Sequence, residues 1–303
     1  MGTAHQVVNV VRGGRCPPYI PVEGGAHPTF NPLLLKMSVQ TLYTAATGMQ
    51  ALETKLDVIA NNMANINTTA FKKDRANFED LFYRQLKLPG ALDADGSITS
   101  TGVEVGLGTR VSSTQTNHGQ GSMQATNNPL DLAIEGRGFF KVTNPNGGFL
   151  YSRAGNFGIN ATGQLVLGSA QKGWVLDPSV TVPQNAVDLV VTSDGQVQYR
   201  TTDSPNLQTA GQMTIATFIN PDGLLKMGDN LFGQTDASGA ATEGNPGTPG
   251  IGVVSQGFLE SSNVEPVQEL IDLITTQRAF ELNSQVVQAG DQVMQVAANL
   301  RRG

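Results

Sequence analysis

The sequence predicts an α+β protein in which a discontinuous coiled-coil domain of paired N- and C-terminal helices accompanies a central all-β domain of sandwich or barrel-like form. Two observations predict it. Apolar residues recur at steps of three and four near both ends of the 303-residue chain, which is the spacing of a narrow helical seam. Between the ends, short β-favouring runs alternate with turn pairs such as Asp194-Gly195 and Asp222-Gly223, as in hairpin-rich β domains.

The first helix is expected over residues 38–68, with Ser38 as its N-cap. Its seam runs without a miss, and the helix should end in the Asn- and Thr-rich stretch 65–69, whose side chains compete with helical hydrogen bonds. A seam this narrow needs a partner helix. We therefore expect an assembly interface at Leu42, Met49, Leu52, Leu56, Ile59, Met63 and Ile66.

The second helix is expected from Val264 to the C-terminus, with Pro266 in its first turn, where proline is tolerated. Its seam breaks at Arg278 and resumes at Leu282. The predicted interface positions here are Val267, Ile271, Ile274, Leu282, Val286, Val293 and Leu300. We expect the two seams to pair within one subunit and with neighbouring copies. Because a lone helix is marginally stable, both helices should be largely disordered before assembly.

The chain divides into five predicted segments. Residues 1–36 are rich in proline and glycine, hold the one cysteine, Cys16, and should be a disordered leader or an upstream start before Met37. The others are an N-terminal helix of an inner-tube domain (37–70), an extended connecting segment (71–115), the β domain (116–258) and the C-terminal helix (259–303). Within the β domain, strands are expected at Leu130–Ile134, Phe139–Val142, Gln164–Leu167, Leu189–Val191, Gln196–Tyr199 and Met213–Phe218, and a loop at 233–251.

Composition narrows the function classes. The formal net charge is -6 with no long run of either sign, which argues against a nucleic-acid or anionic-membrane partner. No apolar run approaches the roughly 18 residues that a membrane span needs, so no membrane insertion is expected. Only 15% of the residues are charged, well under the usual quarter or so. Such a composition fits uncharged contact surfaces.

No catalytic constellation, metal-ligand spacing or cofactor-binding motif emerges, so we predict no enzyme, no metal and no cofactor. His118 lies in a polar stretch and is expected to be a surface-loop histidine. Four carboxylates, those of Asp57, Asp74, Glu79 and Asp80, are expected to be solvated or paired with Lys72, Lys73 and Arg75.

Three segments, in this order, resemble the bacterial flagellar rod and hook family. The N-terminal signature covers 56–72 and includes Asn61, Asn62, Asn65, Asn67, Thr68 and Phe71. The central motifs cover 127–140 and 151–157. The C-terminal signature covers 277–284 and includes Arg278, Glu281 and Asn283. Within the family the chain is most similar to the distal rod branch, because of the long segment after Phe71, including Leu88–Gly108, and the compact middle domain.

The resemblance implies a structural subunit that polymerises helically into the drive shaft that transmits motor torque to the hook. Its implied partners are further copies of itself, the proximal rod and hook axial proteins, the bushing-ring proteins and the flagellar type III export apparatus. Its implied place is the basal-body rod, crossing the periplasm, after export without a cleaved signal peptide.

Alternatives and one departure stay open at this point. The chain could be a proximal rod or hook protein of the same family, or, in a different class, a secreted β-rich adhesin or phage tail-type structural protein. Arg278 and Glu281 are candidates for an ionic contact to a neighbouring subunit. Ala70 stands where the family usually has glycine, and a left-handed backbone there would cost alanine about 1 kcal/mol.

Overall fold

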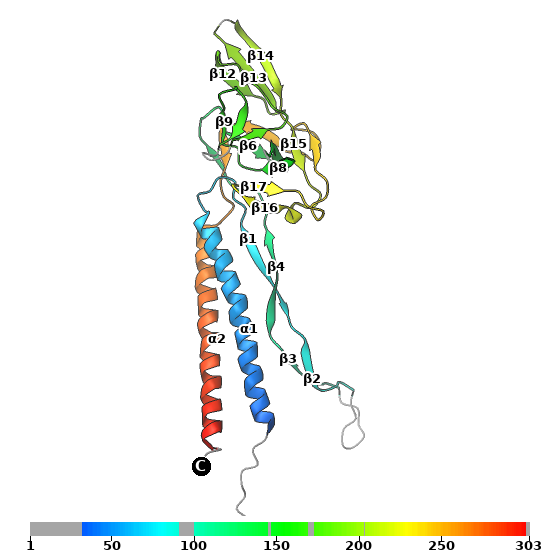
Figure 1. Ribbon diagram of the computed structural model, residues 1–303, viewed down its shortest axis with the longest axis vertical. Coiled ribbons are helices and arrows are strands. Elements are labelled where there is room, and N and C mark those ends of the chain that lie inside the picture. Colours follow the sequence, from blue (N-terminus) through cyan, green and yellow to red (C-terminus); the bar gives the residue numbers. More distant parts are fainter. Residues whose placement is uncertain (1–31, 91–99, 145–146, 169–172, 203, 301–303) are drawn as a thin grey trace, which may run out of the picture.

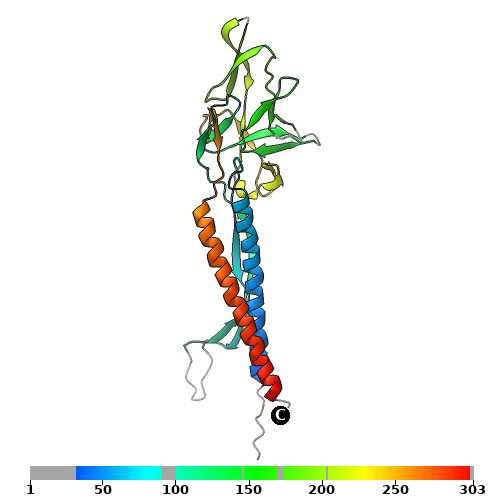
Figure 2. The same cartoon turned by 90° about the vertical axis from the view of Figure 1, so that its left-hand side faces the viewer.

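The computed structural model describes residues 32–90, 100–144, 147–168, 173–202 and 204–300. Two long helices, α1 (Pro32–Ala64) and α2 (Pro266–Leu300), lie side by side at one end of an elongated molecule, and a β-rich region forms the other end (Figure 1). The helices run antiparallel, and a quarter turn shows that they cross at a shallow angle (Figure 2). The predicted α+β class, with terminal helices and a central β-rich region, is confirmed.

Helix α1 begins earlier than expected. It starts at Pro32, so Ser38 lies inside the helix and the predicted N-cap is wrong. Proline suits a first helical position because its missing N–H has no intrahelical partner there. Residues 32–36 of the predicted disordered leader are therefore helical, while residues 1–31 lie outside the described part of the chain. The helix ends at Ala64, directly before the Asn-rich turn.

The connecting segment forms a two-stranded ribbon that runs beside α1 (Figure 1). Strand β1 (Asp74–Asp80) pairs antiparallel with β4 (Thr109–Thr116), and further out β2 (Tyr83–Lys87) pairs with β3 (Val103–Gly106). The ribbon touches α1 where the Thr109 N–H donates to Thr47 Oγ1 at 3.4 Å. The sequence predicts an extended segment over residues 71–115 but does not predict that its strands pair.

The largest sheet of the β-rich region has nine strands in the order β16-β17-β8-β7-β11-β10-β9, with β15 beside β7 and β18 beside β15. Its strands are β7 (Phe139–Thr143), β8 (Phe149–Ser152), β9 (Phe157–Ile159), β10 (Leu165–Leu167), β11 (Trp174–Leu176), β15 (Ile215–Thr217), β16 (Leu225–Gly228), β17 (Leu231–Gly233) and β18 (Thr242–Gly244). A short 3-10 helix, η1 (Pro221–Gly223), precedes β16.

Smaller sheets complete the region. Strands β12 (Ala186–Val191), β13 (Gln196–Thr201) and β14 (Ser204–Gln212) form a three-stranded sheet. Strand β19 (Val253–Gln256) pairs with β6 (Leu132–Glu135), and β20 (Phe258–Glu260) pairs with β5 (Met123–Ala125). The six predicted strands overlap β6, β7, β10, β12, β13 and β15. The predicted loop 233–251 is corrected in two places, because Gly233 ends β17 and residues 242–244 form β18.

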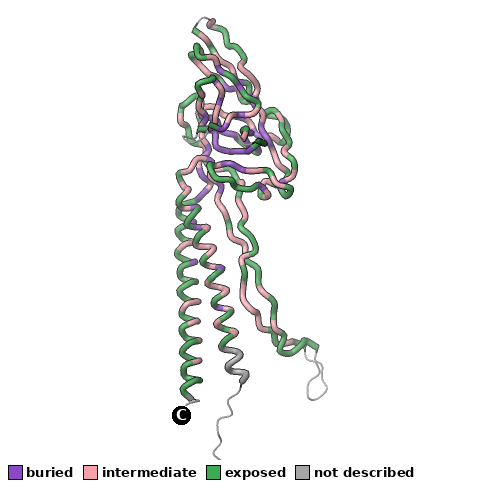
Figure 3. Tube along the Cα trace, in the orientation of Figure 1, coloured by how far each residue is buried: buried purple, intermediate pink, exposed green. Residues whose placement is uncertain are grey.

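The hydrophobic core lies almost wholly in the β-rich region (Figure 3). Inward-facing residues of the main sheet and of β6, β13 and β19, among them Phe140, Ile215 and Val197, are fully buried. A second cluster around Phe139 and Phe232 lies on the other side of the main sheet. By contrast, α2 is exposed or half-buried along most of its length. The single chain therefore has a well-packed β region and two helices that bury little of their surface.

Candidate functional site

The candidate site is the neck, which we define as residues 61–74 and 257–269. Here the end of α1, the start of the ribbon, the last strand of the β region and the start of α2 meet (Figure 1). The two neck segments are joined through their backbones: the Ala70 N–H donates to the Glu260 carbonyl at 2.7 Å and the Asn263 N–H to the Phe71 carbonyl at 3.2 Å. Parts of the chain far apart in sequence are thus fixed to each other at this point.

The Asn-rich signature ends α1 and turns the chain into the neck. The Asn65 amide donates to the Asn61 carbonyl at 2.9 Å, and the Thr68 hydroxyl donates to Asn65 Oδ1 at 3.1 Å. Such local side-chain bonds compete with continued helical pairing and favour a turn here. Asn67, in the same turn, is exposed.

Ala70 occupies the left-handed region, with φ of +54°, and is 2% exposed within the β-region core. The backbone at Ala70 is therefore left-handed, which costs an alanine about 1 kcal/mol or slightly more. Its buried methyl group offsets part of that cost, since burying a methyl group contributes about 0.8 kcal/mol.

Asn62 is the motif residue that joins most parts of the neck. Its side chain is buried; Oδ1 accepts from the Asp74 N–H at 2.9 Å, and Nδ2 donates to the Asp74 carbonyl at 2.9 Å. Nδ2 also lies 3.3 Å from Glu269 Oε2. One amide thus connects α1 to the first residue of β1 and to the first turns of α2, a pairing that only an amide satisfies on both sides.

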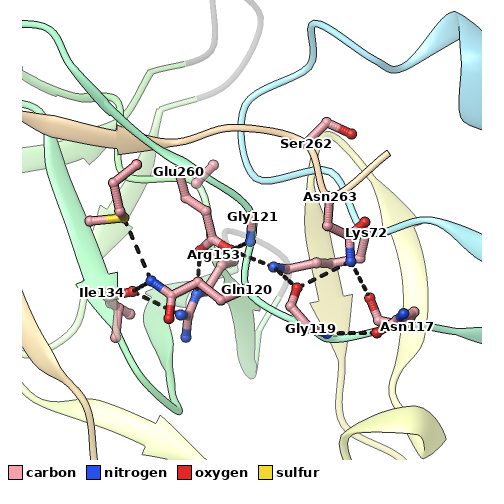
Figure 4. Close-up of polar contacts among 12 residues, drawn as sticks. Lys72, Asn117, Gly119, Gln120, Gly121, Ile134, Arg153, Glu260, Ser262 and Asn263 are labelled. Carbon is pink, nitrogen blue, oxygen red and sulfur yellow. Dashed lines mark hydrogen bonds and ion pairs between the residues drawn. The ribbon is translucent and has the colours of Figure 1, made fainter. Parts of the chain in front are cut away.

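A buried ionic triad lies where the neck enters the β region (Figure 4). Lys72 Nζ lies 2.5 Å from Glu260 Oε1, and Arg153 Nε lies 2.6 Å from Glu260 Oε2. The remaining Arg153 nitrogens donate to the carbonyls of Gly138, Gly136 and Ile134. Lys72 also donates to the Gly119 carbonyl at 2.8 Å, and Glu260 Oε1 accepts from the Gly121 N–H at 2.8 Å.

The electrostatics of the triad favour a charged Glu260. Burial by itself raises the pKa of this carboxyl group, but the charges of Arg153 and Lys72 and their hydrogen bonds outweigh burial and hold the pKa below its ordinary value. Burial lowers the pKa of Lys72, and the attraction of Glu260 only partly offsets it. Two cations around one carboxylate leave a net positive charge, which the surrounding backbone carbonyls stabilise.

Further polar contacts tie the ribbon to the neck. Asn263 accepts from the Lys73 N–H at 2.8 Å, and its amide donates to the Asn117 carbonyl at 2.8 Å. Lys226 Nζ on β16 lies 2.7 Å from Asp74 Oδ1 and 5.1 Å from the centre of the Phe71 ring. Every element that enters the neck is therefore held by at least one side-chain bond.

These contacts correct the predicted pairing of the ribbon charges. Lys72 is not a surface cation but the buried partner of Glu260. Asp74 pairs with Lys226, and Glu79 pairs with Arg110 at 3.1 Å across the ribbon. Arg153 and Glu260 were not among the site residues predicted from the sequence. A signal existed for Arg153, a lone cation within the second central motif, but nothing in the sequence around Glu260 marks it.

The prediction that His118 is a surface-loop residue is wrong. Its ring packs edge-on against Phe139, with ring centres 5.7 Å apart, and lies 5.4 Å from the ring centre of Phe232. Both ring nitrogens are buried and lack a hydrogen-bond partner within the described chain. Burial lowers the pKa of His118 to about 4. The ring also lines a cavity of about 430 Å³ between α1, the base of the ribbon and the start of α2.

The predicted interface positions of α1 lie partly inside the chain. Ile59 is buried, and Leu42, Met49, Leu52, Leu56, Met63 and Ile66 are half-buried. Close approach of the helices occurs at glycines: a Cβ on Gly48 would lie 3.2 Å from the Asn283 amide, and one on Gly290 would lie 2.6 Å from Leu42. Small residues at such points allow the two backbones to approach.

The described side chains at the predicted interface positions of α2 are exposed in the single chain. Val267 is 70% exposed, Leu282 61% and Val293 61%, and Ile271, Ile274 and Val286 are also exposed. The contact with α1 uses another row, which includes Thr276, Asn283 and Gly290. The expectation that the two apolar seams pair inside one subunit is therefore wrong for α2, because the row that faces α1 is a different one, which mixes polar, small and apolar residues. The side chain of Leu300, the last predicted interface position, lies outside the part of the chain whose side chains the structure describes.

The predicted break at Arg278 is a break in periodicity only, because α2 continues through it. Arg278 Nη1 lies 2.9 Å from Glu281 Oε2 on the same helix, and both side chains are exposed. Among the residues that the structure describes, no group of three or more potential ligands could hold a metal ion. Over the same residues, no helix combines the length and apolar character that crossing a bilayer requires.

Three family models match the chain. The flagella basal body rod protein model matches residues 42–72, the flagellar hook protein FlgE/F/G D1 domain model matches 133–199, and the flagellar basal body rod FlgEFG protein C-terminal model matches 255–300. The first contains residues 61–72 of the neck, the last contains all of 257–269, and the second contains Arg153. The class of protein is thus that of the flagellar axial structural proteins.

Curated relatives narrow this class. The flagellar basal-body rod protein FlgG of Caulobacter vibrioides is 45% identical over 87% of this chain and 100% of the relative. The proteins of the same name from Agrobacterium fabrum and Borreliella burgdorferi are 44% and 40% identical, over 86% and 87% of this chain and 98% and 99% of theirs. The chain belongs to the flagellar basal-body rod family. An adhesin or phage tail-type protein is not favoured.

Proposed function

We propose that the chain is a structural subunit of the distal rod of the flagellar basal body, which polymerises helically into the drive shaft that transmits motor torque to the hook. The relatives named as basal-body rod proteins support this, since they match over most of their length. We propose no catalytic activity. The single observation that supports polymerisation is the exposed apolar stripe of α2. We define the stripe as Val267, Ile271, Ile274, Leu282, Val286, Val293 and Val296.

The stripe needs a partner that the single chain does not provide. Burying one large apolar side chain contributes about 1.5–3 kcal/mol, so leaving this row in water forgoes a large stabilisation. An apolar patch of this extent marks an interaction surface. The stripe residues are exposed in the single chain, so a subunit can contact a neighbour through α2 while its own helix pair stays intact. A contact between two different surfaces that repeats along a screw axis produces a filament.

The neck gives the proposed subunit its mechanical role. In this proposal the paired helices form an inner tube with coiled-coil packing between neighbours, and the β region forms an outer layer. Torque then passes between the layers through the neck. A buried ion pair adds little net stability but fixes geometry, because alternatives that separate the charges are costly. The triad of Lys72, Glu260 and Arg153 supports such a fixed joint.

The proposal extends to partners and location. The distal rod subunit would contact proximal rod and hook axial proteins at its two ends and turn inside the bushing-ring proteins. It would reach the periplasm-crossing rod through the flagellar type III export apparatus without a cleaved signal peptide. Terminal helices that order on assembly would prevent polymerisation before export, because an unpaired helix is marginally stable.

The proposal is tested in a strain that lacks the gene for this chain. Electron microscopy should find basal bodies with a proximal rod but no distal rod, and the wild-type chain should restore it. Leu282→Asp, which places a charge in the stripe, should not restore the rod. Gln288→Asp, on an exposed position outside the stripe, is the matched control and should restore it. Complete rods and hooks in the deletion strain would overturn the proposal.

A further inference from the structure

A groove beside the helices is lined by one cationic side chain, that of Arg84, and by no acidic side chain among the described residues. It has a volume of about 330 Å³ and lies between the N-terminal half of α1, the C-terminal half of α2 and the outer part of the ribbon. Its lining includes Arg84 on β2, Leu86 and Val105 on the ribbon, and Val286 on α2. None of the residues that line it is acidic.

Among the described residues that line this groove, Arg84 is the only charged one, and one of its guanidinium nitrogens is unsatisfied. Its Nε atom is buried and finds no hydrogen-bond acceptor within the described chain. Arg84 is half-buried, whereas the other residues of β2 are exposed, so the strand turns this side chain toward the helices. Leaving a buried donor without an acceptor is destabilising. A guanidinium that lacks a partner is best satisfied by a carboxylate, which it binds through two nitrogens.

The free faces of the terminal helices carry the complementary charge. Glu53 and Asp57 on α1 and Asp291 on α2 are exposed, and no ion pair or hydrogen bond engages their carboxylates within the described residues. Between Pro266 and Leu300, α2 carries four acidic residues and one basic residue, Arg278. The same chain thus presents unpaired acids on its helices and an unpaired cation in its groove.

The groove is also continuous with the exposed apolar stripe, because Val286 belongs to both. Leu86, at the ribbon side of the groove, is 51% exposed. A helix that packs on the stripe would therefore pass over Leu86 and bring its polar edge to Arg84. Apolar contacts beside a single ion pair are the usual arrangement of a specific interface.

We propose that this groove binds a terminal helix of a second copy of the chain, with a carboxylate of that helix paired to Arg84. The inference deepens the proposed rod function and rests on it. The apolar stripe supplies most of the binding free energy, and the Arg84 ion pair fixes the register of one subunit on the next. A mismatched register would leave the guanidinium buried without an anion, which disfavours it.

The first test uses charge reversal in the purified full chain. Arg84→Glu should reduce the extent of polymerisation, measured by sedimentation, by tenfold or more, while circular dichroism of the unassembled chain stays unchanged. Lys87→Glu, on the same strand but outside the groove, is the matched control and should polymerise like the wild type. One of Glu53→Lys, Asp57→Lys or Asp291→Lys, combined with Arg84→Glu, should restore polymerisation.

The second test identifies the second copy directly. In a Cys16→Ser background, Arg84→Cys is combined in turn with Glu53→Cys, Asp57→Cys and Asp291→Cys, and the chains are oxidised after assembly. One pair should give a ladder of cross-linked multimers on a non-reducing gel, and Lys87→Cys with the same partners should not. A cross-link confined to monomers, or wild-type polymerisation by Arg84→Glu, would overturn the groove proposal. Failure of the unaltered chain to polymerise would instead count against the rod function.

Discussion

Lys72 and Glu260 form a buried ion pair between residues 188 positions apart, with Nζ and Oε1 separated by 2.5 Å. Lys72 follows α1 and Glu260 ends the last strand before α2, so this pair joins the two chain segments that lead to the helices. Arg153 completes it from the β region. The orientation of the helices relative to the β region therefore depends on three charges.

Replacing Glu260 by glutamine should be strongly destabilising. The variant keeps the shape of the side chain but leaves Lys72 and Arg153 as buried cations without an anion, which costs about 3–5 kcal/mol. Urea unfolding at pH 7 measures the change in the free energy of unfolding. Glu243→Gln is the control, because Glu243 is 41% exposed and its partner Lys141 keeps a second carboxylate, that of Asp177, at 2.7 Å. No buried cation is left without an anion, so the loss should be much smaller. Equal losses for both variants would contradict this account.

His118 should make the protein sensitive to moderate acid. Its pKa in the folded chain is about 4, below the ordinary value of 6.5, so the unfolded chain binds the proton first as the pH falls. Stability should therefore decline between pH 6.5 and 4, by about 3 kcal/mol from this group. Asp222 and Asp74 raise the pKa of the ring, and Lys72 and Lys226 lower it, but burial dominates.

His118→Phe tests this, because it keeps an aromatic ring and removes the titration. Urea unfolding at pH 7, 5.5 and 4 should give a shallower decline for the variant than for the wild type. Identical pH profiles for the two proteins would rule out His118 as the source of the acid sensitivity.

Ala70 should tolerate glycine but not valine. Ala70→Gly relieves a left-handed strain of about 1 kcal/mol, but it removes a buried methyl group and frees the unfolded chain. The opposing effects should keep the change in unfolding free energy within about 1 kcal/mol. Ala70→Val should cost more than about 2 kcal/mol, because a β-branched residue is poorly accommodated at positive φ. Thermal unfolding of the two variants measures both changes in stability. A valine variant as stable as the wild type would show that the turn relaxes.

Asn62 should be more sensitive to substitution than its neighbours in the signature. Asn62→Asp replaces the donor to the Asp74 carbonyl by a carboxylate and places it near Glu269. The loss should be about 2–3 kcal/mol at pH 7, from one unsatisfied buried carbonyl and one like-charge contact. Asn67→Ala, in the exposed part of the same turn, should change little. Comparable losses would mean that Asn62 does not join α1 to the neck as its contacts indicate.

The sequence predicted the features that depend on local patterns. The second helix, which begins at Pro266 rather than at the predicted Val264, the turn after Ala64 and strands such as β7 follow from capping, turn chemistry and β-favouring runs. The exposed row of α2 was visible as a seam, but its partner was not, because periodicity marks an apolar face without saying what covers it. The ribbon was missed because both of its faces are largely exposed, so β1 and β4 lack the apolar alternation of a half-buried strand.

The neck was largely invisible for a related reason. Lys72, Glu260 and His118 all lie in polar surroundings in sequence, where charged and imidazole side chains are usually solvated. Their burial follows from segments that meet only in the folded chain. Family resemblance marked Asn62, Lys72 and Arg153 as parts of motifs, but it did not say that two of them share one carboxylate.

The two halves of the neck lie far apart in the sequence, and this distance determines when a subunit can complete its fold. Asn62 bonds Glu269, 207 positions later, so a chain that emerges N-terminus first reaches its complete architecture only after nearly all of it is free. Closing so long a loop carries an entropic cost that no partial contact recovers. A prematurely truncated product would retain α1 and the ribbon yet lack the carboxylate for Lys72. Only a chain that includes both Glu260 and Glu269 can therefore form every contact of the neck.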